Sequence, residues 1–197
     1  MIDIVFPEKN EKEFFAVAQK IGYTGLVLVY PSVDAARNAP KPPTGLKVRT
    51  ALLADPKRAH HLRSKGFMVF VKCSDQDRVV LERGSADVIF SAESTQPKDY
   101  THQRGSGLNH VLCDLAKKNK VAIGFSFSDI LASRDSQRVQ LIGRMMQNIM
   151  LCRKYKVRMV IGSFAKDPWK MRSPHDLKSF FIVLGMHPEE AASALSL

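Results

Sequence analysis

The sequence predicts an α/β protein in which helices cover a parallel sheet. Three observations favour this fold class: short apolar, β-branched segments recur along the chain, most of them are continuously apolar, and helical patterns separate them. Continuously apolar strands are typical of a parallel sheet that is buried on both faces. The length of 197 residues fits a single domain, residues 1–197.

Seven segments have the length and composition of buried strands. They are Ile2 to Phe6, Gly25 to Tyr30, Val48 to Leu53, Phe67 to Lys72, Asp87 to Ser91, Val121 to Phe127 and Met159 to Ser163. Seven strands that alternate with helices fit either a small (β/α) barrel or an open doubly wound sheet. The pattern by itself leaves both architectures open.

Helical patterns fill most of the intervals between these strands. The expected helices are Glu11 to Lys20, Pro56 to Ser64, Gly107 to Asn119, Asp135 to Tyr155, Pro174 to about Leu184, and a last one from Pro188. Ser173 before Pro174 is a typical helix start, in which the serine caps the first turn. In the long helix, apolar residues at helical spacing predict the buried face: Val139, Ile142, Met146 and Ile149.

The stretch from Pro31 to Gly45 is the exception to this alternation. It holds four prolines and no helical or strand pattern. We therefore expect a mobile surface loop there rather than a linker between domains.

The charge of the chain indicates a polyanionic partner. Lys and Arg total 30 against 19 Asp and Glu, which gives a net charge of +11. The excess is uneven, because Arg134 to Arg172 holds ten basic residues and only two acidic ones. Six of the ten are arginines, whose planar donors suit phosphate groups. A solvated surface that merely keeps the protein in solution is the alternative.

Several classes of protein lack support in the sequence. The three cysteines are far apart, no apolar run approaches the ~18 residues of a membrane span, and no signal peptide pattern is present, so we expect a cytoplasmic protein. No catalytic serine or cysteine signature occurs. The histidines form no metal-binding motif, and we expect neither a catalytic residue nor a metal site. They are His60, His61, His102, His110, His175 and His187.

Basic residues follow the predicted strands at the ends where α/β proteins carry their functional loops. Lys72 closes the fourth strand, Arg104 lies in the long 92–107 loop after the fifth, and three more follow the seventh: Lys166, Lys170 and Arg172. We predict that these five residues bind the phosphates of the polyanionic partner. Arg49 and Arg158 sit at strand starts, on the opposite rim, where a role in stability is expected.

Gly105-Ser106-Gly107 precedes a predicted helix and allows two interpretations. Backbone N–H groups at a glycine-rich helix start can hold a phosphate. The segment matches neither of the established nucleotide-binding glycine patterns, so a flexible helix entry is the alternative.

Two motifs resemble the archaeal ribonuclease P protein component 3 family. The first is the run from Arg104 to Leu112, which includes Asn109 and His110, followed by the Lys117 to Phe127 segment. The second is the order of Ile161-Gly162-Ser163, Arg172-Ser173-Pro174 and Leu184-Gly185-Met186. The similarity covers nearly the whole chain, including the opening strand.

The resemblance implies a TIM-barrel-like fold and a role in ribonuclease P, the endonuclease that removes 5′ leaders from precursor tRNA. It implies that the chemistry resides on the RNA, with magnesium bound there, and that the isolated chain is inactive. It also implies contacts with ribonuclease P RNA, component 2 and the other protein subunits, and with precursor tRNA through the holoenzyme. Metal-dependent barrel relatives would carry His-x-His near the first strand, where this chain has Ile2-Asp3-Ile4.

We therefore predict a protein subunit of ribonuclease P that supports the catalytic RNA through basic residues. Two alternatives stay open at this point. One is a metal-dependent barrel phosphoesterase, which could also use basic loops at a strand-end cavity. The other is a general module that binds structured RNA.

Overall fold

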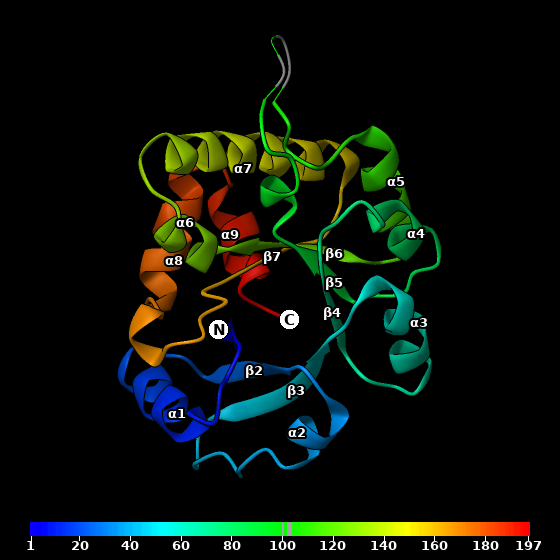
Figure 1. Ribbon diagram of the computed structural model, residues 1–197. Coiled ribbons are helices and arrows are strands. Elements are labelled where there is room, and N and C mark those ends of the chain that lie inside the picture. Colours follow the sequence, from blue (N-terminus) through cyan, green and yellow to red (C-terminus); the bar gives the residue numbers. More distant parts are fainter. Residues whose placement is uncertain (100, 102–103) are drawn as a thin grey trace.

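The computed structural model describes residues 1–99, 101 and 104–197 and contains one sheet of seven parallel strands (Figure 1). Each strand pairs with its neighbours in chain order, and the seven predicted strands are confirmed with ends that shift by at most two residues. The strands are β1 (Ile2–Val5), β2 (Gly25–Tyr30), β3 (Lys47–Leu53), β4 (Val69–Lys72), β5 (Val88–Phe90), β6 (Ala122–Ser126) and β7 (Met159–Gly162).

The sheet is nearly closed, through contacts between β1 and the segment that follows β7. The Phe164 N–H donates to the Ile4 carbonyl at 2.8 Å, and the Phe6 N–H donates to the Ala165 carbonyl at 2.8 Å. A parallel bridge joins Val5 to Ala165 in the same segment. The fold is therefore a seven-stranded (β/α) barrel of the TIM-barrel-like type, and the open doubly wound sheet is excluded.

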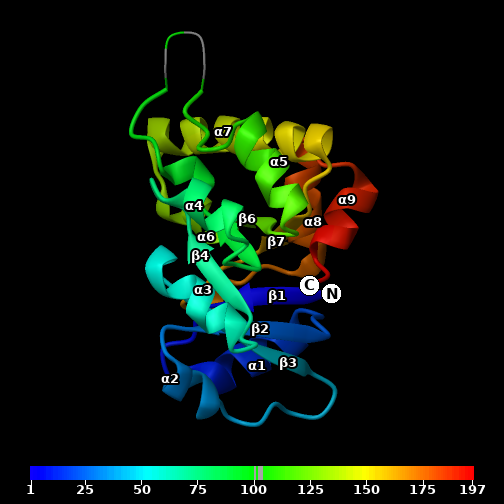
Figure 2. The same cartoon turned by 90° about the vertical axis from the view of Figure 1, so that its right-hand side faces the viewer.

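Helices surround the barrel, as Figures 1 and 2 show from two sides. They are α1 (Glu11–Lys20), α2 (Val33–Arg37), α3 (Pro56–Ser64), α4 (Asp77–Glu82), α5 (His110–Lys118), α6 (Phe127–Ala132), α7 (Asp135–Tyr155), α8 (Pro174–Val183) and α9 (Pro188–Ala194). Two short 3₁₀ helices, η1 (Ala92–Ser94) and η2 (Pro168–Lys170), follow β5 and β7. Among the described helices, none has the length and apolar composition needed to cross a membrane.

Side chains fill both the barrel and the layer outside it. The interior cluster contains Val27, Phe70, Val88, Phe90 and Phe164, each at most 6% exposed. Residues on the other face of the strands, such as Leu28 and Ile123, pack with the helices in a larger cluster. Because apolar side chains cover both faces, the strands read as continuous apolar runs in the sequence.

The proline-rich stretch after β2 contains the short helix α2, so the expectation of a loop is wrong for Val33–Arg37, whereas residues 38–45 form neither a helix nor a strand. The Ser32 hydroxyl accepts a hydrogen bond from the Ala35 N–H at 3.2 Å and caps α2. A capping serine starts a helix even where prolines follow closely. The short helices α4 and α6 were also not predicted, because a helix of about one and a half turns leaves little periodic pattern.

The predicted buried face of α7 is right for Ile149, while Ile142 packs partly buried against the core, and it is wrong for Val139 and Met146. Val139 is 72% exposed and Met146 is 40% exposed, whereas Met145, Asn148 and Ile149 are fully buried. The inward face carries Leu141, Met145, Ile149 and Cys152, and with them the polar Arg144 and Asn148. The apolar pattern misled the prediction because two polar residues occupy core positions.

Arg49 and Arg158 hold the last residues of the chain at the amino ends of the strands. The Arg49 guanidinium donates to the Leu197 carbonyl at 2.8 Å, and Arg158 donates to the Ser196 carbonyl at 3.1 Å. These bonds agree with the stability role expected on this rim.

Candidate functional site

A cavity of about 450 Å³ lies at the carboxyl ends of the strands and brings together three of the five predicted RNA-binding residues. Lys72 is the last residue of β4, whereas Lys166 and Lys170 follow β7, and all three line the cavity and are exposed. We call this cavity, with its lining residues, the barrel mouth. The lysines meet there because parallel strands end on the same side of the sheet.

The two lysines after β7 sit on a segment with fixed geometry. Asn10 donates through Nδ2 to the Lys166 carbonyl at 3.0 Å, and the Lys166 ammonium pairs with Glu8 at 3.0 Å on the surface. Asp167 accepts from the Trp169 N–H at 3.0 Å and starts η2, which carries Lys170. The ion pair of Lys166 is exposed and easily exchanged for another anion.

Serines and one carboxylate provide the other polar groups of the barrel mouth. Ser126 ends β6 and caps α6 by accepting from the Asp129 N–H at 3.2 Å. The Ser128 hydroxyl donates to the Ser163 carbonyl at 2.7 Å. Ser91 follows β5. Among the described residues, its buried hydroxyl has no hydrogen-bond partner, and the buried Oδ2 atom of Asp129 has none either. Sequence reasoning missed the serines, although Ser91 directly follows β5 and Ser126 ends β6.

Aromatic rings form the floor of the barrel mouth. The ring centres of Phe90 and Phe164 are 5.1 Å apart, and Phe6 lies 5.7 Å from Phe90 and 6.0 Å from Phe164. Leu53 and Leu131 complete the apolar wall. The cavity therefore combines a basic rim with an apolar base.

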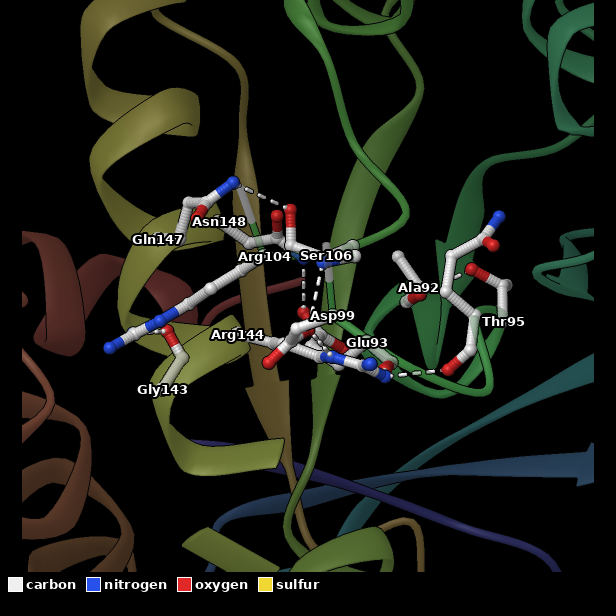
Figure 3. A network of polar contacts seen from close by, with 12 residues as sticks. Ala92, Glu93, Thr95, Asp99, Arg104, Ser106, Gly143, Arg144, Gln147 and Asn148 are labelled. Carbon is white, nitrogen blue, oxygen red and sulfur yellow. Dashed lines mark hydrogen bonds and ion pairs between the residues drawn. The ribbon is translucent and has the colours of Figure 1, made fainter. Parts of the chain in front are cut away.

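Arg104 lies apart from the barrel mouth, on the segment that packs along α7 (Figure 3). Its guanidinium donates to the Gly143 carbonyl at 2.5 Å, and a side chain on Gly143 would collide with it. The side chain is exposed, so part of the guanidinium remains accessible to solvent.

Arg172 also has partners within the chain. It donates to the Met171 carbonyl at 2.8 Å, and its Cζ atom lies 5.6 Å from the centre of the Phe127 ring. This arrangement is a cation–π contact, which holds the guanidinium against α6. The structure thus does not place Arg104 and Arg172 on the barrel mouth with the three lysines, and their RNA contacts stay a prediction.

Asn109 and His110 begin α5. Asn109 is the N-cap residue and accepts from the Leu112 N–H at 2.9 Å, and His110 is the first residue of the helix and is exposed. Asn109 therefore has a structural role, since a cap of this kind satisfies an otherwise free N–H group.

Gly105-Ser106-Gly107 is packed rather than flexible. The Gly105 N–H donates to Asp99 at 2.8 Å, and the Ser106 carbonyl accepts from Asn148 at 2.8 Å. Gly107 has φ +80°, and a Cβ atom there would lie 2.1 Å from the Ala92 carbonyl oxygen. The glycines allow close packing, and the Gly105 N–H is already occupied, so the phosphate-cradle interpretation has no support here.

A buried polar network, shown in Figure 3, holds the segment between η1 and α5 on α7. Arg144 donates to Asp99 at 2.8 Å and to the carbonyls of Glu93 and Gln96 at 2.9 and 2.7 Å. Asn148 donates to the Glu93 carboxylate at 2.7 Å. Burial raises the pKa of Glu93 to about 7, although the hydrogen bond from Asn148 opposes the shift.

Sequence reasoning counted Arg144 among the basic residues of a possible RNA-binding face. The structure buries it, at 4% exposed, and assigns it to the network. Its position in the helix could have indicated this burial, because Arg144 shares its helix face with the buried Leu141, Met145 and Asn148.

In the part of the chain that the structure describes, no three His, Cys, Asp or Glu side chains are grouped in a way that could hold a metal ion. His102 lies outside the described residues.

Comparisons with known proteins agree with this architecture. The profile of the family described as RNase P subunit p30 matches residues 79–197. Ribonuclease P protein component 3 of Methanosarcina mazei is 30% identical over 194 residues, which cover 94% of this chain and 79% of the relative. The protein of the same name from Methanococcoides burtonii is 29% identical over 198 residues, covering 96% of this chain and 79% of the relative.

Solved structures share the fold. A chain from the cryo-EM structure of archaeal ribonuclease P with mature tRNA superposes with a TM-score of 0.75 at 22% identity, covering 99% of this chain and 87% of that chain. The crystal structure of A. niger ochratoxinase superposes with a TM-score of 0.57 at 11% identity, covering 93% of this chain and 61% of that chain. These two structural similarities show a shared fold, whereas the family profile and the sequence relatives show common descent. The chain belongs to the RNase P subunit p30 family, and it is similar over nearly its whole length to proteins named ribonuclease P protein component 3.

Proposed function

We propose that this protein supports the catalytic RNA of ribonuclease P, the endonuclease that removes 5′ leaders from precursor tRNA. The observation that carries the proposal is the convergence of Lys72, Lys166 and Lys170 on the barrel mouth of a member of this family. Three ammonium groups on one rim attract the phosphates of a folded RNA.

The contribution of the protein is electrostatic. Ammonium groups neutralise phosphates, so that RNA helices approach each other and the active RNA conformation forms at a lower magnesium concentration. The magnesium ions of the reaction are bound by the RNA in this proposal, and precursor tRNA meets the protein only within the holoenzyme.

The wider charge distribution supports the same role. Of the ten basic residues between Arg134 and Arg172, seven are exposed, and only Arg144 is buried. Arg104 and Arg172 are further candidates for phosphate contacts at the ends of their side chains. Component 2 and the other protein subunits are the expected protein partners, and the cytoplasm is the expected location.

The test is a cleavage assay with ribonuclease P reconstituted from its RNA and proteins, over a series of salt concentrations. The variants Lys72→Gln, Lys166→Gln and Lys170→Gln should each weaken RNA association and lower the log–log salt slope by about 0.7 to 0.9. Lys47→Gln and Lys120→Gln are matched controls, because these exposed lysines lie at the start of β3 and before β6 on the opposite rim. Equal effects at both rims would contradict the assignment.

A further inference from the structure

The barrel mouth contains a buried serine in an unfavourable conformation. Ser91 is 1% exposed and lines the cavity, and its hydroxyl has no hydrogen-bond partner among the described residues. Its φ of 62° lies in the left-handed region, which costs free energy for any residue with a Cβ atom. Buried hydroxyls in folded proteins almost always have a hydrogen-bond partner, so an unpaired one on a residue that lines a cavity points to that cavity as a binding site.

A second residue of the same cavity shares this strain. Among the described residues other than glycine, six have a positive φ, and four of these are exposed charged residues: Lys9, Lys120, Asp135 and Lys156. The other two are Ser91 and Phe164, which are both buried and both line the barrel mouth. Strained backbone that gathers at one cavity is typical of a binding site.

The polar groups of the cavity are of two kinds. The ammonium groups of Lys72, Lys166 and Lys170 are donors that suit an anion. The half-buried Asp129 adds a carboxylate to the lining, and its Oδ2 atom has no hydrogen-bond partner among the described residues; a carboxylate suits a hydroxyl or an amine. A simple anion such as inorganic phosphate would use the lysines and be repelled by Asp129.

The shape of the cavity adds a third requirement. A volume of about 450 Å³ lies within the range of ~300–1,000 Å³ found for small-molecule sites. Its base is apolar and aromatic, formed by Phe6, Phe90, Phe164 and two leucines. The ligand therefore carries an anion, a hydroxyl or amine donor and a flat apolar group.

We infer that the barrel mouth binds one ribonucleotide, with its phosphate on the three lysines, its ribose hydroxyls on Asp129 and its base against the apolar wall. The Ser91 hydroxyl completes the hydrogen bonds of the ligand. Carboxylates recognise ribose hydroxyls in this way in other nucleotide sites. The nucleotide is either free in solution or part of an RNA strand, and the inference rests on the proposed function only for the second source.

The first experiment measures binding of nucleoside monophosphates to the isolated protein at low salt by calorimetry and by ligand-detected NMR. A ribonucleoside monophosphate should bind about tenfold more tightly than its nucleoside, its 2′-deoxy form or inorganic phosphate, because each lacks a charge-assisted contact or the base. Equal affinity for inorganic phosphate, or no detectable binding of any monophosphate, overturns the inference.

Variants separate binding from folding. Lys166→Gln and Lys170→Gln should each weaken nucleotide binding about tenfold, and Asp129→Asn should remove the preference for ribose over 2′-deoxyribose. Ser91→Gly removes the hydroxyl and relieves the left-handed strain, so it should weaken binding without lowering the melting temperature. Lys156→Gly relieves the same kind of strain on the opposite rim and should leave binding unchanged. Unchanged binding in Ser91→Gly together with both lysine variants refutes the site.

A second arm identifies the source of the nucleotide. A short 5′-phosphorylated oligoribonucleotide should compete with the monophosphate if the site takes a strand end, and an unpaired internal nucleotide should compete if the site takes a base that leaves its stack. If no RNA competes while the monophosphate binds, the ligand is the free nucleotide. If holoenzyme that carries these variants then cleaves precursor tRNA normally, nucleotide binding at the barrel mouth still stands. Only the use of this site in ribonuclease P is contradicted.

Discussion

Ser163 donates two hydrogen bonds to Asp3, one from its backbone N–H at 2.6 Å and one from its hydroxyl at 2.7 Å. The two residues are 160 positions apart, so this contact joins β1 to the segment that follows β7. Asp3 is fully buried, and burial raises its pKa from 3.8 to about 6 against the opposing effect of the Ser163 bonds. The closure of the barrel therefore depends on a carboxyl group that titrates in an accessible range of pH.

The raised pKa of the buried Asp3 predicts how the stability of the fold depends on pH. The folded protein binds the Asp3 proton more tightly than the unfolded chain, so the free energy of unfolding falls as pH rises from about 4 to about 6. The change from 3.8 to about 6 corresponds to about 3 kcal/mol. Asp3→Asn should remove this part of the slope and leave the protein more stable near pH 7, as measured by urea unfolding. Asp34→Asn is the surface control, and a slope that is the same in both variants would exclude Asp3 as its source.

Glu93 gives a second pH prediction at another place in the molecule. Its pKa of about 7, raised by burial, means that deprotonation destabilises the folded state as pH rises from about 4.5 to about 7. Glu93→Gln keeps an oxygen that can accept from Asn148 and should raise the free energy of unfolding at pH 8 relative to the wild type. Chemical denaturation at pH 5 and pH 8 checks this, with the exposed Glu189→Gln as control. No gain at pH 8 would show that Glu93 carries no such cost.

Two glycines of similar conformation differ in their surroundings. Gly107 and Gly22 have φ of +80° and +91°, but a Cβ atom would collide with the Ala92 carbonyl at Gly107 and meet nothing within 4 Å at Gly22. Gly22→Ala should cost about 1 kcal/mol from backbone strain alone. Gly107→Ala should cost about 3 kcal/mol or more, because overpacking adds to the strain. Equal shifts in melting temperature would mean that the loop after η1 moves away from the methyl group at little cost.

A substitution of Arg172 tests whether one residue contributes both to packing and to RNA binding. Because its guanidinium contacts Phe127 and the Met171 carbonyl, Arg172→Ala should lower the free energy of unfolding by about 1 kcal/mol. Lys170→Gln should leave the melting temperature unchanged, since Lys170 is exposed on η2. The salt slope of RNA association for the Arg172 variant then decides the second role. A slope lowered by about 0.7 to 0.9 shows a phosphate contact, and an unchanged slope shows packing alone.

Much of the fold could be read from the sequence because burial on both faces leaves a plain signal. A run such as Gly25–Tyr30 is apolar throughout, and its strand has the predicted ends. Closure into a barrel was not readable, since it depends on hydrogen bonds between Ile4, Phe6 and the residues after β7. Spacing within a segment carries no information about a pairing across 160 residues.

The site was predictable only in part, for a related reason. Lys72, Lys166 and Lys170 follow strands, and parallel strands bring their ends together, so their convergence could be expected. The inward orientation of Arg144 depends on which face of α7 the core selects. The strain at Ser91 depends on a backbone angle, which serine as a residue type does not indicate.

The joint between β1 and β7 has a consequence for how the molecule opens. Backbone amides at Phe6 and Phe164 cross this joint, and Phe164 is also part of the barrel mouth. Regions of a protein exchange their amide hydrogens at rates set by local opening, and a molecule bound to the closed form slows that exchange. A ligand bound at the barrel mouth should therefore slow the exchange of the Phe6 and Phe164 amide hydrogens for deuterium. The exchange rates of the residues that complete the barrel would thus measure whether the barrel mouth is occupied.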